Sequence, residues 1–327
     1  MTALFPGFLR APWPRPADPE AASREIERWH EATADIDDPA AAAFAAKLAG
    51  SRPGRRCLAA IFGNSPFLSD AMNGEVGFAA LLLHRGPDAA FAQVLDQVRT
   101  ASTAVGAGAE LMTELRRAKR RAAVAIALAD IAGLWPLERV TGALSELAEV
   151  ALSLASRHLL REAEAAGALR LADDAAPELS SGLVILGMGK LGARELNYSS
   201  DIDLIVLYDE EAITSADPDA LQKHFVRLAR GIARIMEEHT QDGYVFRTDF
   251  RLRPDPGSTP PAMSTSAAES YYESVGQNWE RAAMIKARAV AGDPMAGARF
   301  LARLRPYIWR KHLDFAAISD IHSIKRQ

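Results

Sequence analysis

The sequence of 327 residues contains a single cysteine, Cys57. One thiol cannot form an intrachain disulfide or supply a cysteine-based metal cage, so a reducing, cytosolic compartment is expected. An excess of positive charge is also missing: 38 Lys and Arg residues stand against 42 Asp and Glu, which gives a net charge of −4. A protein that coats nucleic acid or an anionic membrane needs a basic surface. We therefore expect neither nucleic acid nor membrane as a partner.

Long apolar runs are absent as well. The most apolar stretch, residues 122–129, ends at Asp130 and is too short to span a bilayer. The first residues lack a basic head followed by a long apolar run, so no secretory signal is visible. Apolar residues make up 49% of the chain and charged residues 24%, which is ordinary for a globular protein with a large core. The length favours about two domains.

The first half of the chain is rich in alanine and leucine and has few β-branched runs, a composition that favours helix. Apolar residues from Leu137 to His158 recur at alternating steps of three and four, which is typical of one face of a long helix. We predict helices at about 19–33, 39–49, 67–84, 87–103, 109–131 and 136–166, separated by Gly and Pro at 50–54, 63–66 and 86–87. Residues 1–166 are thus expected to form a helical domain.

The character of the chain changes near residues 167–182, a polar link with Pro177 and Gly182. We predict strands at 183–186, 202–208 and 244–251, with a helix at about 219–239. The fold class expected is α+β, a mainly helical chain whose domain at 167–264 holds a small mixed sheet, with strands confined to about 183–264. Helical segments are predicted for 265–327, and because their pattern reaches the last residue without a stop signal, the chain is expected to be cut from a longer protein.

The segment from Leu183 to Asp209 is the richest in functional signals, and two familiar interpretations of it fit poorly. Gly187, Gly189 and Gly192 approach the dinucleotide-binding pattern, with Asp209 at the end of the next apolar run. About nine residues follow the third glycine, which is too few for the crossover of a βαβ unit. A P-loop also fails, because Leu191 stands where Ser or Thr must bind magnesium.

A metal-dependent nucleotidyl transfer site fits better. Asp201 and Asp203 open a strand, and strand alternation places both carboxylates on one face. Two such groups, about 7 Å apart, can bridge a pair of magnesium ions that act on a phosphoryl group. Asp249, on the predicted third strand, is the natural third ligand. Ser199 and Ser200 can donate hydrogen bonds beside the metals, and the glycine turn lets backbone amides approach phosphate oxygens.

Three segments, in order, resemble a known family. GMGKLGARELNYSSDIDLIVLYD is similar to the nucleotidyltransferase motif of the bifunctional glutamine synthetase adenylyltransferase/deadenylylase family, and GYVFRTDFRLRPDPGS and SYYESVGQNWERAAMIKARAVAGD resemble the stretches that follow it. The similarity covers about 183–294 closely. ELNYSSDIDL resembles the N-terminal, deadenylylating half. One departure is Ala193, which replaces a glycine common in that turn.

The resemblance implies a polymerase-beta-like nucleotidyltransferase core, Mg²⁺ as the cofactor, and phosphorolysis. Inorganic phosphate attacks the AMP attached to a tyrosine of glutamine synthetase, so that ADP leaves and the tyrosine is restored. It also implies control by the PII signal protein in its uridylylated form. Asp201 and Asp203 match the metal-binding pair, Asp249 matches the third acid, and Gly187, Gly189 and Lys190 fall in the phosphate-facing turn.

Four further cations are candidates for nucleotide or phosphate binding. Arg251 and Arg253 alternate on the strand that leaves Asp249, so they are expected on its face with their bidentate forks available to phosphate. The alternative is a surface pair that braces the loop at 254–261. Lys286 and Arg288 follow an apolar helix and are candidates for reaching the nucleotide, or else a solvated helix end.

Two alternative functions remain open at this point. One is the opposite half-reaction, in which ATP adenylylates glutamine synthetase at a site of the same design. The other is a non-catalytic nucleotide-binding sensor, which would bind ADP without turnover. The intact Asp201, Asp203 and Asp249 argue against the sensor.

Overall fold

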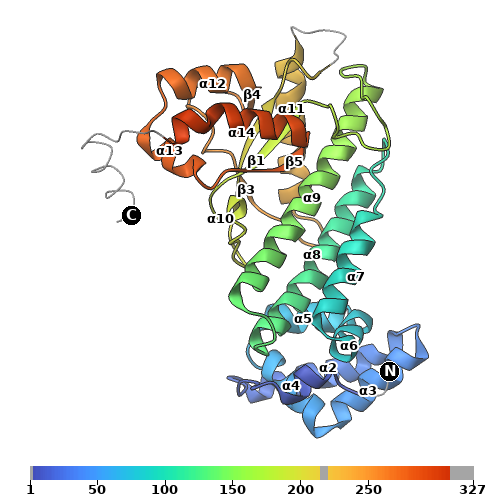
Figure 1. Cartoon of the computed structure of the whole chain (residues 1–327). Coiled ribbons are helices and arrows are strands. Elements are labelled where there is room, and N and C mark those ends of the chain that lie inside the picture. The colour runs from blue at the N-terminus through green and yellow to red at the C-terminus, as the bar shows by residue number, and fades with distance from the viewer. Residues whose placement is uncertain (1–2, 214–219, 310–327) are drawn as a thin grey trace. The chain divides into compact units, whose positions relative to one another are not determined.

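A computed structural model describes residues 3–213 and 220–309, and internal contacts divide the chain into two compact units. Unit 1 comprises 1–100 and 117–143, and unit 2 comprises 101–116 and 144–327 (Figure 1). These units group residues by spatial contact, and the three domains expected from the sequence stay a prediction. No helix among the described residues is long and apolar enough to cross a membrane.

Unit 1 is helical. Four of its helices begin with Pro in the first turn after a Ser or Asp whose side chain accepts a hydrogen bond from a backbone amide of that turn, a combination that starts helices efficiently. The elements are α1 (Pro6–Arg10), α2 (Pro19–Ala32), the 3₁₀ turn Thr33–Asp35, α3 (Pro39–Gly50), α4 (Arg52–Phe62), α5 (Pro66–Gly74), α6 (Val76–Arg85) and α7 (Pro87–Arg99).

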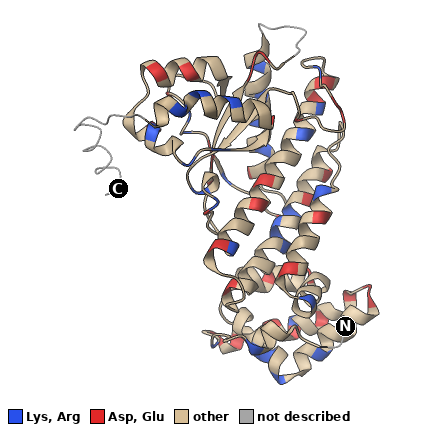
Figure 2. Cartoon of the chain, viewed as in Figure 1, with Lys and Arg blue, Asp and Glu red and all other residues tan. Residues whose placement is uncertain are grey.

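Two long helices, α8 (Gly108–Ile131) and α9 (Leu137–Ala165), contribute residues to both units. The predicted helices at 109–131 and 136–166 are confirmed within one residue at each end. The described residues up to Ala165 contain helices and no strand, as the composition indicates. Figure 2 shows positively and negatively charged residues interspersed along the helices, in line with the near-balanced net charge.

Two predictions about the helices of unit 1 were wrong. Residues 50–54 were expected to separate helices, yet α4 begins at Arg52, because Pro53 lies in the first helical turn, where its missing amide hydrogen costs nothing. The helix expected at 67–84 is two helices, α5 and α6, which are separated at Glu75, whose backbone is not helical.

The sheet lies in unit 2 and is mixed, as predicted. Its strands are β1 (Leu183–Gly187), β2 (Ile202–Tyr208), β3 (Thr248–Asp249), β4 (Ala262–Ser264) and β5 (Arg288–Gly292). The order is β3–β2–β1–β5, and β4 also pairs with β2. Strand β1 is antiparallel to both β2 and β5, whereas β3 and β4 are parallel to β2. β1 and β2 are almost completely buried, which explains their continuous apolar sequences.

Helices cover both faces of this sheet (Figure 1). On one face α12 (Thr265–Ser274), α13 (Asn278–Met284) and α14 (Pro294–Ile308) form a core with β1 and β2 that includes Val184, Leu207 and Phe300. The other principal helix, α11 (Leu221–Glu237), contacts β2, β3 and β4, and its Phe225 stacks on Tyr208 with ring centroids 4.7 Å apart. The predicted helix at 219–239 is therefore confirmed over the residues that α11 covers.

Two strand predictions need correction. The strand expected at 244–251 is reduced to β3, because only Thr248 and Asp249 align with β2 and the chain then turns. Strands are not confined to 183–264, because β5 lies at 288–292, inside the segment that was predicted to be helical. The short sequence of β5 carries little pattern of its own, and pairing with β1 makes it a strand.

The close approach of α3 and α4 gives a test of the fold. A methyl group at Gly54 would lie 2.1 Å from the backbone oxygen of Leu48, whereas one at Gly142, within α9, would meet nothing within 4 Å. We expect Gly54→Ala to lower the free energy of unfolding by about 1–3 kcal/mol and Gly142→Ala to raise it by about 0.5–1 kcal/mol. Denaturant titration of both variants measures the difference, and equal effects would contradict the α3–α4 packing.

Candidate active site

The connection from β1 to β2, residues 188–201, begins with a glycine-rich turn that approaches Asp203. It contains the single helical turn α10 (Gly189–Gly192). Gly189 has a positive φ of 51°, and a methyl group there would lie 3.1 Å from Oδ2 of Asp203. A methyl group at Gly192 would lie 2.0 Å from the backbone oxygen of Lys286. Only glycine therefore lets this turn approach both Asp203 and the chain before β5.

The parallel pairing of β2 and β3 brings two of the predicted acids together. Asp203 and Asp249 are register partners, so they are direct neighbours on adjacent strands. Burial raises the pKa of Asp203, and the charges of Asp249 and Asp201 raise it further. Ile202 is fully buried whereas Asp201 is exposed and Asp203 half-buried, as strand alternation predicts. Three carboxylates thus act on one another electrostatically at this edge of the sheet.

Two arginines neutralise the outer members of this acidic group. Arg251 donates to both carboxylate oxygens of Asp249, and this contact holds the pKa of Asp249 below its ordinary value. Nε of Arg247 donates to Oδ1 of Asp201 at 2.5 Å. Arg247 was not among the residues proposed from the sequence. Its position two residues before Asp249 in YVFRTDFR was the available signal.

These contacts decide how far the residues fit a metal ion. Carboxylate oxygens are the ligands that Mg²⁺ prefers, and the mutual repulsion that raises the pKa of Asp203 is what a divalent cation would relieve. Among residues 3–213 and 220–309, however, no three His, Cys, Asp or Glu side chains are arranged as a metal site. The donor set fits magnesium, but Arg247 and Arg251 must release their aspartates first. Metal binding by Asp201, Asp203 and Asp249 remains a prediction.

The other residues of the turn lie near this group. Nζ of Lys190 donates to Oγ of Ser200 at 3.2 Å, and the positive charge of Lys190 acts on the pKa of Asp203. The backbone oxygen of Ser199 accepts a hydrogen bond from Arg247. Gly187 ends β1, where a methyl group would lie 2.7 Å from Val290. A role for these residues in holding phosphate stays a prediction.

The charge of Arg253 helps to lower the pKa of Asp249, but strand alternation does not place Arg253 beside it. The prediction assumed that strand alternation continues to Arg253, but β3 ends at Asp249 and the chain turns. The guanidinium of Arg253 instead donates to the backbone oxygens of Phe250, Pro256 and Thr259. It therefore braces the loop, which was the alternative considered for this residue.

Lys286 and Arg288 both contact the glycine turn or the residues that follow it. Nζ of Lys286 donates to Glu195 at 2.7 Å. Arg288 is the first residue of β5 and not a solvated helix end. Its guanidinium donates to the backbone oxygens of Leu191 and Gly192 and to Glu149. In this structure Arg288 holds the turn in place.

The dinucleotide interpretation is excluded by the topology. It needs parallel strands joined by a crossover helix, but β1 and β2 are antiparallel and only the four-residue α10 lies between them. Asp209, the acid that this interpretation assigned to ribose, pairs with Arg299 at 2.6 Å and accepts a hydrogen bond from the amide of Glu211.

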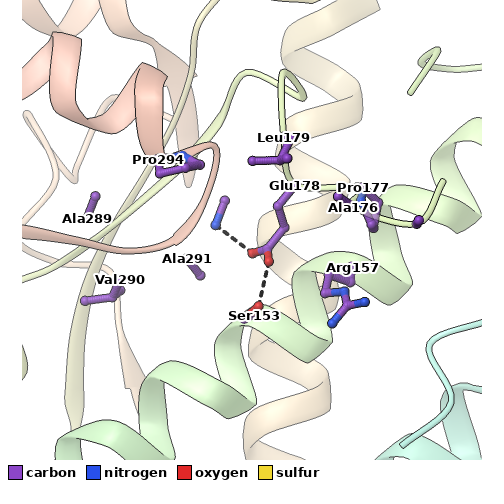
Figure 3. A pocket seen from close by; sticks show the side chains of 12 residues that line it. Ser153, Arg157, Ala176, Pro177, Glu178, Leu179, Ala289, Val290, Ala291 and Pro294 are labelled. Atoms are coloured by element: carbon purple, nitrogen blue, oxygen red, sulfur yellow. Dashed lines mark hydrogen bonds between the residues drawn. The ribbon is translucent and has the colours of Figure 1, made fainter. Parts of the chain in front are cut away.

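A cavity of about 540 Å³ is lined by residues of α9, the loop at 175–179, β5 and the start of α14, and by none of the predicted site residues. Figure 3 shows Glu178 reaching across to Ser153, whose hydroxyl donates to it at 2.6 Å. The other oxygen of Glu178 accepts from the amide of Gly292. Burial raises the pKa of Glu178. Because β5 is an edge strand, this carboxylate satisfies a backbone donor that pairing leaves open.

Comparison with known proteins gives one consistent result. Residues 56–303 match the family described as glutamate-ammonia ligase adenylyltransferase. The chain is similar to proteins named bifunctional glutamine synthetase adenylyltransferase/adenylyl-removing enzyme. It is 48% identical to the protein of Brucella suis over 95% of this chain and 31% of the relative, and 52% identical to that of Rhizobium meliloti over 86% and 29%. The chain thus spans about a third of the length of these relatives.

The crowding at Asp203 predicts a pH-dependent effect on stability. A pKa raised by folding means that the ionised form destabilises the folded protein, and this penalty disappears at acidic pH, where Asp203 is protonated in both states. In the presence of a chelator, Asp203→Asn should raise the free energy of unfolding at pH 7 by about 0.5–1 kcal/mol. The gain should shrink below about pH 4.

Urea titration at pH 7 and at pH about 3.5 measures this effect. Asp37→Asn is the matched control, because Asp37 is exposed and lies in unit 1. A loss of stability in Asp203→Asn at pH 7 would contradict the repulsion inferred among these carboxylates.

Proposed function

Because the chain belongs to the glutamate-ammonia ligase adenylyltransferase family, we propose that it removes AMP from the adenylylated tyrosine of glutamine synthetase by phosphorolysis. The observation that carries the proposal is the pairing of Asp203 with Asp249 under the glycine turn, with Asp201 close enough to raise the pKa of Asp203. The relatives are named for adding and removing adenylyl groups. The segment ELNYSSDIDL, which resembles the deadenylylating half, supports removal.

The proposed reaction is an in-line displacement at the phosphorus of the AMP–tyrosine diester. An oxygen of inorganic phosphate forms a new bond to this phosphorus, the bond to the tyrosine oxygen breaks, and the phenolate takes up a proton. The products are ADP and unmodified tyrosine. Tyrosine is a tolerable leaving group because its phenol has a pKa near 10.

The chain's own residues must bring two anions together. Asp201, Asp203 and Asp249 would hold magnesium, which when bound supplies positive charge to the phosphate oxygens. Arg251 is exposed and next to the acids, so its guanidinium would bind the incoming phosphate once it releases Asp249. Lys190 adds a further positive charge at the turn. Gly189 leaves room for a phosphate oxygen beside Asp203, where a larger residue would crowd it.

Partners of the proposed reaction follow from the family. Glutamine synthetase is the protein substrate, phosphate and ADP are the small-molecule substrate and product, and the uridylylated PII protein is the proposed regulator. The second candidate is transfer of AMP from ATP onto glutamine synthetase, because the relatives' name includes both directions. The same acids and arginines would serve it, so an assay must separate the two.

We expect the 327-residue chain to release ADP from adenylylated glutamine synthetase only when both Mg²⁺ and phosphate are present. Chromatography of the nucleotide product measures this. Release of AMP at an equal rate without phosphate would identify water as the nucleophile. Transfer of AMP from ATP onto unmodified synthetase, without removal, would assign the second candidate. Binding of ADP with neither activity would indicate a sensor.

A second expectation concerns Arg251. If it binds the incoming phosphate, Arg251→Ala should raise the KM for phosphate about tenfold, the size of one lost charge-assisted hydrogen bond. The Mg²⁺ requirement should change less. Arg28→Ala is the control, because Arg28 is an exposed arginine of unit 1 that pairs with Asp70. An unchanged phosphate KM in Arg251→Ala would remove Arg251 from the site.

A further inference from the structure

Two exposed guanidinium groups occupy the carboxylates that the proposed function assigns to metal. The side chain of Arg251 is 83% exposed and takes both oxygens of Asp249. The side chain of Arg247 is 50% exposed and pairs with Asp201. The carboxylate of Asp203 has no hydrogen-bond or ion-pair partner among the described residues, and only the backbone oxygen of Asp203 is bonded, to the amide of Met188. Of the three carboxylates, those of Asp201 and Asp249 are therefore paired with arginines, and that of Asp203 is not.

Three partners orient Arg247. Besides its bond to Asp201, its guanidinium donates to the backbone oxygen of Ser199 at 2.7 Å and to the hydroxyl of Tyr244 at 3.3 Å. Ser199 belongs to the segment between the glycine turn and β2, and Tyr244 lies three residues before Arg247. If the bond to Asp201 is lost, the remaining two contacts keep the guanidinium beside the acids.

Other arginines near the site are committed to backbone oxygens. Arg253 donates to three of them, and Arg288 donates to two and to Glu149. The backbone oxygens that hold Arg253 and Arg288 are not among the ligands assigned to the metal, so a cation bound to the aspartates does not compete for them. It does compete for the carboxylate oxygens that hold Arg247 and Arg251. Arg247 and Arg251 are thus distinguished from Arg253 and Arg288 because they bind carboxylates that the proposed function assigns to the metal.

We propose that Arg247 and Arg251 exchange partners: each holds its aspartate in the metal-free protein and donates instead to a nucleotide or substrate phosphate once a divalent cation occupies the carboxylates. This inference rests on the proposed function. The exchange costs little, because an exposed ion pair contributes about 0–1 kcal/mol. Carboxylate and phosphate oxygens are both acceptors for a guanidinium. Arg251, which binds both oxygens of Asp249, can therefore keep a two-point contact, and Arg247, which binds one oxygen of Asp201, can keep a single one.

The exchange predicts opposite effects on two binding constants. Removing the competing guanidinium in Arg247→Gln should tighten binding of Mn²⁺ alone about two- to fivefold, the equivalent of an exposed ion pair. The same change should weaken binding of ADP in saturating Mn²⁺ about tenfold, because one charge-assisted contact to phosphate is lost. Arg251→Gln should act in the same two directions, and Arg247→Lys should restore part of the ADP affinity.

The experiment uses the whole chain. Electron paramagnetic resonance of free Mn²⁺ gives the metal affinity, and calorimetry gives the ADP affinity in Mn²⁺. Arg303→Gln is the matched control, because Arg303 is 51% exposed, lies in unit 2 and pairs with Glu211 and Glu269. It should change neither constant.

The outcomes separate this inference from the proposed function. If the unaltered chain binds Mn²⁺ and ADP, but Arg247→Gln binds both more weakly, Arg247 orients Asp201 for the metal and no exchange occurs. If Arg247→Gln changes neither constant, Arg247 is an ordinary surface residue and the inference is wrong. If the unaltered chain does not bind Mn²⁺ at all, the proposed function itself fails.

Discussion

Repulsion among three carboxylates is the constraint on which the rest of the site depends. The parallel pairing of β3 with β2 places Asp249 beside Asp203, and Asp201 comes one residue before the same strand. The pKa of Asp203 shows the result, because burial and both neighbouring acids raise it. A fold keeps such an arrangement only if nearby positive charge compensates it. Arg247, Arg251 and Lys190 supply that charge.

The arginines around the site have two different roles. Arg253 and Arg288 bind mainly backbone oxygens, so they fix the shape of the loop and of the turn. Arg247 and Arg251 bind carboxylates and are exposed, so they respond to whatever else binds there. Sequence spacing does not separate these two groups, since Arg247, Arg251 and Arg253 alternate along one short segment. Only their hydrogen-bond partners distinguish them.

Elements with their own periodic pattern could be predicted from the sequence. The long helices, β2 and the pair Asp201 and Asp203 are each recognisable from the spacing of residues that lie close together in sequence. The missed elements depend on distant partners. β5 is a strand because β1 lies beside it, β3 is short because only two residues meet β2, and α4 includes a proline that looked like a break. Arg247 was missed for the same reason, because its importance lies in a contact with Asp201, 46 residues earlier.

The contact of Arg288 with the glycine turn has a consequence for biosynthesis. The donor and the backbone oxygen of Gly192 are separated by 96 residues. Strands β1 and β2 therefore leave the ribosome well before the segment that clamps the turn between them. At roughly 5–20 residues per second, that interval lasts about 5–20 s. For the last part of this interval, from Asp249 to Arg288, the nascent chain has all three aspartates but an unclamped turn, so the arrangement of the turn beside them must wait for β5.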